Sequence, residues 1–216
     1  MEFERIGYRK CSFPFDWLIT RQAGVVFDLI ENGFQDFLNP EELFQLKDHP
    51  SYYRNVKLDI DYYHDFSPLR SFSAQIAEVE EKYNRRIQRF YEEIKKPTLF
   101  CRYIRAEDCG YIAENHSRIV SLLKKYNEQN EIIYIANADI KDLDRSLPVY
   151  YVEKDENDNV ARRFLEKLPA LQTFIEENVE QTAQKQKKPV VKKTLAKIVR
   201  KICLKLNWVY RHNKQI

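Results

Sequence analysis

Side chains that together support thiol chemistry occur in two short motifs of this chain. His64 lies in the run YHDF, directly after a segment of alternating apolar residues. This position suits a general base, although a lone histidine in a loop is more often a hydrogen-bonded structural group. Asp16 lies between two large aromatic residues in the septet CSFPFDW. The septet predicts either a tight turn in which Asp16 caps the following helix or a buried carboxylate that orients a histidine.

Cys11 begins the same septet and is the cysteine nearest to these candidates. Cys101, inside an apolar run, is expected in the core, and Cys109, at a helix start, is expected to be an inert thiol. The four cysteines form no CxxC pair and lack the Cys/His spacing of a zinc site, so we expect neither a disulfide framework nor a metal. With only four glycines, the chain lacks the glycine-rich loops of common nucleotide sites, and no cofactor is expected.

Three further residues are candidates for substrate binding. Trp17 follows Asp16, Arg86 flanks the apolar stripe of a long helix, and Arg102 lies inside a short apolar run. We expect Asp16, His64 and Arg102 to converge in one pocket, because these polar groups have no evident packing role.

The elements that must position these residues follow from the hydrophobic pattern, which predicts an α/β fold with a mostly parallel sheet flanked by helices. We expect short helices over 24–30 and 40–46, an extended segment over 52–63, a helix over 72–94, strands over 99–104, 131–136 and 149–152, and helices over 106–126 and 160–179. The strands 99–104 and 131–136 are expected to be adjacent and parallel, because a helix links two buried runs. His116, on the inner face of that helix, is expected to be a satisfied core histidine. Residues 1–180 are therefore predicted to form a single domain.

The charge is divided between the body and the C-terminal end. Eleven of the 36 basic residues and none of the 33 acidic ones lie in 181–216, which leaves 25 basic against 33 acidic residues in 1–180. This acidic body is not expected to bind nucleic acid. Residues 181–189 are predicted to be a linker and 190–216 a basic amphipathic helical tail, which docks on the body, binds an anionic membrane surface or contacts a partner. No signal peptide or spanning segment is evident, so we expect a cytoplasmic protein, which is peripheral at the inner membrane face if the tail binds membrane.

Four runs of the sequence occur together: RKCSFPFDW at 9–17, YHDF at 63–66, YNRRIQRF at 83–90 and LFCR at 99–102. Over about residues 4–155 the chain thereby resembles the bacterial family of putative papain-like cysteine peptidases, a domain of unknown function often found among surface-polysaccharide genes. The resemblance implies that the nucleophile lies upstream of PFDW, in an LGxxC-type segment that this sequence does not contain. We therefore expect either a longer protein or one that lacks the thiol. Cys11 lies where the family has variable small residues.

Two function classes follow from these observations. The first is a thiol-dependent hydrolase or acyl-transfer enzyme acting on a peptide or glycan-linked substrate. In it a thiolate attacks, His64 transfers the proton, and Asp16 or a later carboxylate such as Asp139 orients the imidazole. The second is a non-peptidase role in capsule or cell-surface polysaccharide biosynthesis, with the tail on the membrane. An LGxxC segment encoded in frame upstream of Met1 would favour the first.

Overall fold

The computed structural model describes residues 11–140 and 146–152. Their contacts divide the chain into two compact units. One unit is Ser12–Glu93, and the other contains Cys11 and resumes at Ile94. The expected helix 160–179, the linker and the basic tail lie outside the described residues. Within the described ranges, no helix combines the length and apolarity that crossing a membrane requires.

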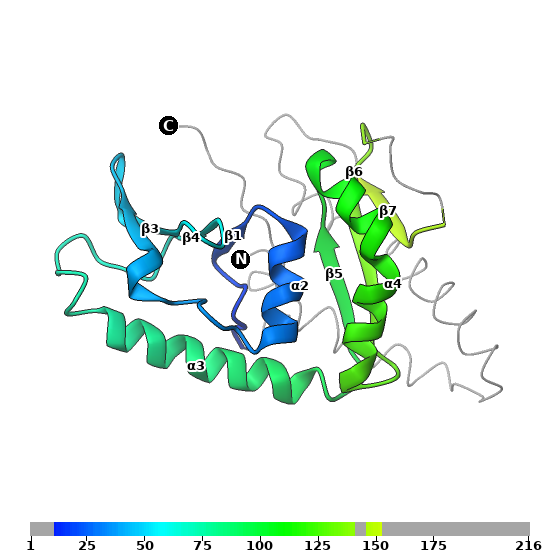
Figure 1. Ribbon diagram of the computed structural model, residues 1–216, viewed down its shortest axis with the longest axis horizontal. Helices are drawn as coiled ribbons and strands as arrows, with labels where there is room; N and C mark the ends of the chain where they lie inside the picture. Colours follow the sequence, from blue (N-terminus) through cyan, green and yellow to red (C-terminus); the bar gives the residue numbers. More distant parts are fainter. Residues whose placement is uncertain (1–10, 141–145, 153–216) are drawn as a thin grey trace. The chain divides into compact units, whose positions relative to one another are not determined.

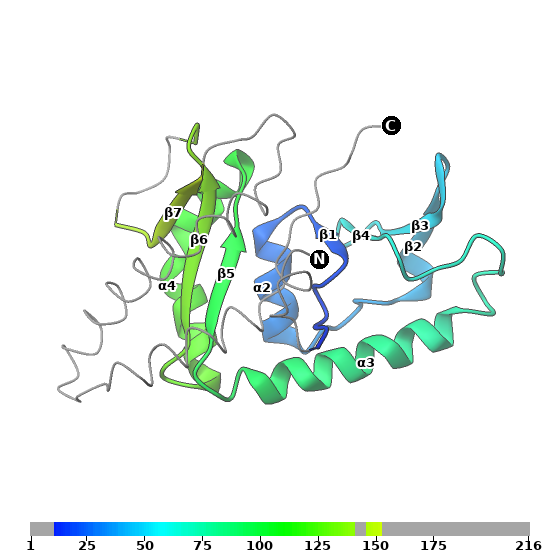
Figure 2. The same cartoon turned by 180° about the vertical axis from the view of Figure 1, so that it is seen from behind.

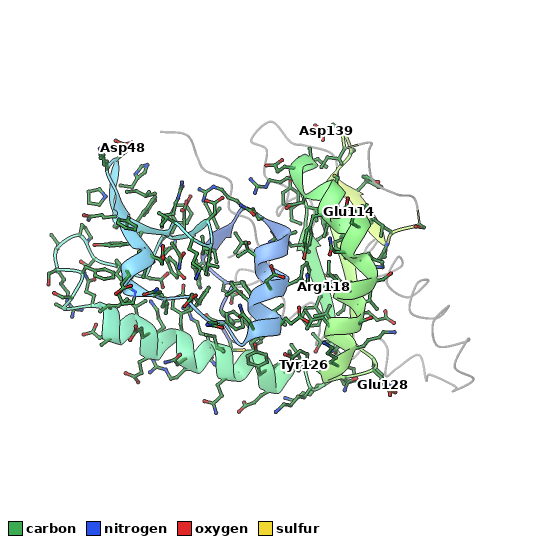
Figure 3. All side chains as sticks on the ribbon, in the orientation of Figure 1. Asp48, Glu114, Arg118, Tyr126, Glu128 and Asp139 are labelled. Carbon is green, nitrogen blue, oxygen red and sulfur yellow. The ribbon has the colours of Figure 1, made fainter. Side chains whose placement is uncertain are left out.

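The Ser12–Glu93 unit is built on a four-stranded antiparallel sheet with the order β1-β4-β3-β2. Its elements in chain order are β1 (Leu18–Thr20), α2 (Ala23–Asn32), the short helix η1 (Pro40–Glu42), β2 (Leu43–Leu46), β3 (His49–Asn55), β4 (Ile60–Tyr62) and α3 (Ile76–Glu93). In Figure 1, α3 runs along one side of this sheet and α2 lies beside β1. The β2–β3 hairpin carries Asp48 at its tip (Figure 3).

The first expected helix is confirmed as α2, which extends the prediction at both ends. Its apolar residues recur at helical spacing, and Val26, Leu29 and Ile30 are fully buried. Gly33 ends the helix with φ of 76°, a left-handed conformation that glycine adopts without steric cost. The Phe34 amide then donates to the Leu29 carbonyl at 2.8 Å.

The expected helix over 40–46 is wrong, although its cap is correct. Asn39 Oδ1 accepts a hydrogen bond from the Glu41 amide at 3.1 Å, which starts the single turn η1. From Leu43 the chain becomes β2, because pairing with β3 satisfies more backbone groups than a further helical turn of this short segment would. Local capping thus predicted where a helix begins but not where it ends.

The extended segment predicted over 52–63 is two strands, not one. A turn over 56–59 separates β3 from β4, and Asn55 Oδ1 closes it by accepting from the Leu58 amide at 2.9 Å. Asp59 in this turn has φ of 51°. The apolar alternation therefore continues through a turn, with Val56 half exposed at its start. Pairing across this turn is antiparallel, so the expected single, mostly parallel sheet is wrong for this unit.

The long helix is confirmed as α3, which starts four residues later than the expected 72. The Gln75 side chain organises the preceding loop: its Oε1 accepts from the Ser67 amide at 2.6 Å, and its Nε2 donates to the Ser67, Arg70 and Ser71 carbonyls at 3.1, 2.8 and 3.1 Å. These contacts hold residues 67–71 in a closed loop ahead of the helix. The buried face of α3 consists of Val79, Tyr83 and Phe90.

The second unit contains the predicted β-α-β arrangement. Its elements are β5 (Leu99–Tyr103), the short helix η2 (Ala106–Asp108), α4 (Cys109–Tyr126), β6 (Glu131–Asn137) and β7 (Val149–Val152). The sheet order is β5-β6-β7 and both pairs are parallel, as expected. Figures 1 and 2 show from opposite sides that α4 covers one face of this sheet. The chain is therefore an α/β protein with one antiparallel and one parallel sheet in its described residues.

Buried Asn130 closes the β-α-β arrangement. Its Nδ2 donates to the carbonyls of Ile94 at 2.7 Å and Leu123 at 2.9 Å, and its Oδ1 accepts from the Thr98 amide at 3.0 Å. One side chain thus joins the end of α4 to the segments that precede β5 and β6. Such a fully satisfied polar group fixes the relative position of these elements within the core.

Candidate active site

The PFDW run forms a tight turn that the Asp16 carboxylate closes. The Asp16 amide donates to the Phe13 carbonyl at 3.2 Å, and the Phe13 amide donates to Asp16 Oδ2 at 2.9 Å. Both residues are buried. The turn leads into β1, and α2 begins only after Gln22, whose side chain makes no capping bond. The expected tight turn is confirmed, and the expected capping of a following helix by Asp16 is wrong.

Trp17 leaves this turn in a strained backbone conformation and contacts His64. Its φ is 72°, in the left-handed region, which costs a bulky residue about 1–2 kcal/mol. The Trp17 and His64 rings are perpendicular, with an interplanar angle of 88° and centroids 5.6 Å apart. Strain of this kind persists where the surrounding structure imposes it, and it collects at functional sites. The PFDW turn thus places an indole against the candidate base.

His64 is exposed and lies two residues after the end of β4 at Tyr62. The Tyr63 ring lies 6.2 Å from the His64 ring, centroid to centroid. An exposed imidazole against an aromatic partner is accessible to a substrate and restricted in its orientation, as a general base requires. Asp16, Trp17 and His64 belong to one unit. The contact of Trp17 with His64 joins the PFDW turn to the YHDF run.

The side chain of Asp65, next to His64, is buried and has two partners from α3. Its carboxylate is 2% exposed. The Tyr83 hydroxyl donates to Asp65 Oδ2 at 2.8 Å, and Lys82 Nζ lies 2.5 Å from Oδ1. Burial raises the pKa of Tyr83 well above its usual value, and the charge of Asp65 raises it further. Tyr83 is therefore a neutral donor at physiological pH.

Arg86 lies one turn after Lys82 on α3. Its guanidinium carbon is 5.0 Å from the centroid of the Tyr83 ring. Arg86 Nη1 is buried and has no hydrogen-bond partner within the described ranges. A buried donor without a partner suits an acceptor brought by a ligand. Its predicted role in substrate binding stays a prediction.

Arg102 and Cys11 belong to the second unit, so the expected convergence of Arg102 with Asp16 and His64 stays a prediction. Cys11 is half buried. Arg102 lies in β5 and is buried. Burial lowers the pKa of Arg102 to about 10, against the opposing effect of the Asp108 carboxylate. Arg102 therefore remains a cation at physiological pH.

The other two described thiols are buried, which confirms the expected core position of Cys101. Cys101 lies inside β5 and Cys109 at the first position of α4, and both are buried. Cys109 Sγ also lies 3.5 Å from the Arg105 carbonyl. Asp139, the alternative carboxylate for the imidazole, is exposed in the turn after β6, at the carboxyl end of the parallel sheet (Figure 3).

His116 is the satisfied histidine that the sequence predicts. Its Nδ1 lies 3.0 Å from the Tyr134 hydroxyl, within hydrogen-bond distance, and the two rings are 5.6 Å apart. Burial lowers the pKa of His116 and raises that of Tyr134. Both groups are therefore neutral near pH 7, which fits a structural role in packing α4 on β6.

Sequence reasoning missed the contact of Asp65 with Lys82 and Tyr83. The partners are 17 and 18 residues away in sequence, and no spacing rule joins a loop to the middle of a helix. Two signals were present: Asp65 follows the candidate base, and the apolar stripe of α3 carries a hydroxyl at Tyr83.

Comparison with known proteins assigns the family. A family model described as "Putative papain-like cysteine peptidase (DUF1796)" matches residues 1–134. The chain belongs to this family. It is also 27% identical, over 111 residues, to an uncharacterized protein of Acanthamoeba polyphaga mimivirus. That match covers 42% of this chain and 49% of the viral protein, so the chain spans about half the length of this relative. No solved structure matches.

The match contains both motifs of the candidate site, since residues 1–134 include the PFDW turn and the YHDF run. The family description agrees with the expected coarse class, a cysteine peptidase. No group of three or more His, Cys, Asp or Glu side chains within 11–140 and 146–152 is arranged to hold a metal ion.

Proposed function

We propose that this chain is a thiol-dependent hydrolase or acyl-transfer enzyme in which His64 is the general base. The observation that supports this most strongly is the perpendicular contact between exposed His64 and Trp17 at 5.6 Å. The strained backbone of Trp17 makes this contact more specific than chance packing of two surface rings. Family membership supplies the reaction class.

In this mechanism His64 takes the proton of a cysteine thiol, and the thiolate attacks the substrate carbonyl carbon. The imidazolium then returns the proton to the leaving amine or alcohol as the carbonyl re-forms, which leaves a thioester. Water or another acceptor, deprotonated by His64, attacks this thioester and releases the thiol. Asp16 and Asp139 remain candidates for orienting the imidazole. Arg86, Arg102 and Trp17 remain candidates for binding the substrate.

The thiol is either Cys11 or, as the resemblance implies, a cysteine of an LGxxC segment upstream of PFDW. Among the described thiols, Cys11 is the one that is not buried. The two cases differ in their consequences, because a Cys11→Ser variant loses the reaction only in the first.

The test is a panel of fluorogenic peptides, esters and thioesters, offered to the protein expressed with any in-frame codons that precede Met1. We expect His64→Gln to lower the hydrolysis rate by about 100-fold or more, the usual contribution of a general base. His116→Gln is the matched control, because His116 is held by Tyr134. Unchanged hydrolysis in His64→Gln, or none by the parent on every substrate, contradicts the proposal.

A further inference from the structure

The residues on both sides of His64 are fixed by buried contacts. Tyr62 is fully buried, and its hydroxyl donates to the Phe37 carbonyl. Phe66 is buried against Tyr53, with ring centroids 4.3 Å apart, and against Phe72 at 5.5 Å. His64 is therefore an exposed residue in a backbone segment that cannot shift without disturbing the core.

The strongest of these anchors is the carboxylate of Asp65. Each of its two oxygens has its own donor, the Tyr83 hydroxyl at 2.8 Å and Lys82 Nζ at 2.5 Å. Both donors come from consecutive positions of α3, so the residue after His64 is joined to the middle of an 18-residue helix. Charge-assisted bonds to a buried carboxylate are short and directional, and they tolerate little displacement.

A carboxylate at this place is costly to bury. Moving it out of water opposes folding, and pairing with one cation often does no more than offset that cost. An apolar side chain would fill the same space without this penalty. The gain from Asp65 is thus in specificity of conformation, since two oxygens with fixed partners define both the position and the rotation of the backbone that carries His64.

We propose that Asp65 is a positioning residue for His64. Through Tyr83 and Lys82 it holds the imidazole against Trp17, in the orientation that proton transfer requires. This inference rests on the proposed role of His64 as general base, but the contact with Trp17 can be measured without any substrate.

The measurement is the fluorescence of Trp17 as a function of pH in a Trp208→Phe background, where Trp17 is the one remaining tryptophan of the two in the sequence. A protonated imidazole quenches an adjacent indole, so fluorescence should rise as His64 loses its proton. His64→Gln should remove this step. That variant also separates the signal from His49, which is connected to His64 through ring contacts of Tyr52 and Tyr63.

In this background we expect Asp65→Asn to reduce the amplitude of the fluorescence step by about two-fold or more, because a displacement of about 1 Å suffices to disrupt a positioned group. Tyr83→Phe, which keeps the carboxylate, should reduce it in the same direction. Asp61→Asn is the matched control. It removes the buried carboxylate of Asp61 in β4, which pairs with Arg21 and Arg54, so it lowers stability and should leave the amplitude unchanged.

The proposal is overturned if the fluorescence step keeps its full amplitude in both Asp65→Asn and Tyr83→Phe. It is also overturned if Asp61→Asn reduces the amplitude as much as Asp65→Asn does. A parent without a His64-dependent step also overturns it. Circular dichroism identifies any variant that fails to fold, in which case Tyr83→Phe decides. Loss of the step in Asp65→Asn together with His64-independent hydrolysis would mean that the positioning is correct and the proposed function is wrong.

Discussion

Trp17 and His64 come from motifs 47 residues apart, yet their rings lie perpendicular with centroids 5.6 Å apart. This contact depends on a backbone that tryptophan adopts reluctantly, since φ at Trp17 is 72°. The free-energy cost of the strained backbone at Trp17 can be measured separately from the contact between the two rings.

We expect Trp17→Gly to be more stable than Trp17→Ala by about 1 kcal/mol, because both variants lack the indole and only alanine still carries a Cβ in the left-handed region. Urea denaturation of the two variants gives the difference directly. A Trp17→Ala protein as stable as Trp17→Gly would show that the backbone relaxes once the ring is removed, and that the indole rather than the PFDW turn imposes the strain.

A buried carboxylate stabilises the antiparallel sheet through two arginines. Asp61 is 3% exposed in its side chain and lies 2.5 Å from Arg21 Nη2 and 2.6 Å from Arg54 Nε. Asp61→Asn should lower the free energy of unfolding by about 2–3 kcal/mol. Breaking a fully buried ion pair costs about 3–5 kcal/mol, and the loss is smaller here because both guanidinium groups are partly exposed. Chemical denaturation at pH 7 measures this. A loss below about 0.5 kcal/mol would show that the cluster stabilises the fold no more than an ordinary surface ion pair does.

The same carboxylate predicts part of the acid sensitivity of the fold. Burial raises the pKa of Asp61, but the hydrogen bonds from Arg21 and Arg54 outweigh burial and lower it overall. The stabilisation that Asp61 provides is therefore complete above its pKa of about 3.9 in the unfolded chain. It is lost as the pH falls through the lower pKa of Asp61 in the folded chain. The free energy of unfolding of Asp61→Asn should lack this pH-dependent contribution when unfolding is measured from pH 5 downward. An unchanged acid transition would contradict it.

His116 should control stability at a higher pH. Burial lowers its pKa in the folded chain, so the unfolded chain binds the proton more readily once the pH falls below about 6.5. Stability should thus decrease from pH 7 toward the folded pKa, and His116→Gln should flatten that slope. His49→Gln, which instead removes a half-buried histidine at the start of β3, serves as the control. Equal slopes in the parent and His116→Gln would show that burial does not lower the pKa of His116 in the folded chain.

The long helix α3 and the parallel sheet could be predicted from sequence because their signals are local. The stripe of α3 and the apolar runs of β5 and β6 each extend over enough residues for the period to identify the element. The antiparallel half depends on partners instead. Residues 43–46 look helical until β3 pairs with them, and the alternation over 52–63 hides a turn that Asn55 closes.

The candidate site divides in the same way. Residue types identified Asp16, Trp17 and His64, because an aspartate between aromatics and a histidine after apolar alternation are unusual without any partner being known. Residue types alone could not identify the Asp65–Tyr83 hydrogen bond, since it depends on how α3 packs against β4. Sequence thus indicated the candidate groups, while the groups that hold them required the structure.

The basic tail gives a prediction that rests on sequence alone. If 190–216 binds membrane, the full chain should co-sediment with anionic vesicles at low salt and be released at high salt, because lysines near the surface contribute about 1 kcal/mol each. Changing Lys193, Lys197 and Lys201 to glutamate should weaken binding by about 100-fold or more. Equal pelleting of the parent and the variant would favour docking of the tail on the body.

Cys11 provides the last test, which decides between the two thiols of the proposed mechanism. The resemblance places the nucleophile farther upstream, so we expect iodoacetamide to alkylate Cys11 no faster in the folded protein than in the urea-unfolded protein. His64→Gln should leave that rate unchanged, and a Cys101→Ser, Cys109→Ser, Cys203→Ser background isolates the Cys11 signal. A catalytic thiol would instead react faster in the folded protein, since a neighbouring imidazolium favours the thiolate, and it would lose this reactivity in His64→Gln. Reactivity of the second kind would assign the nucleophile to Cys11.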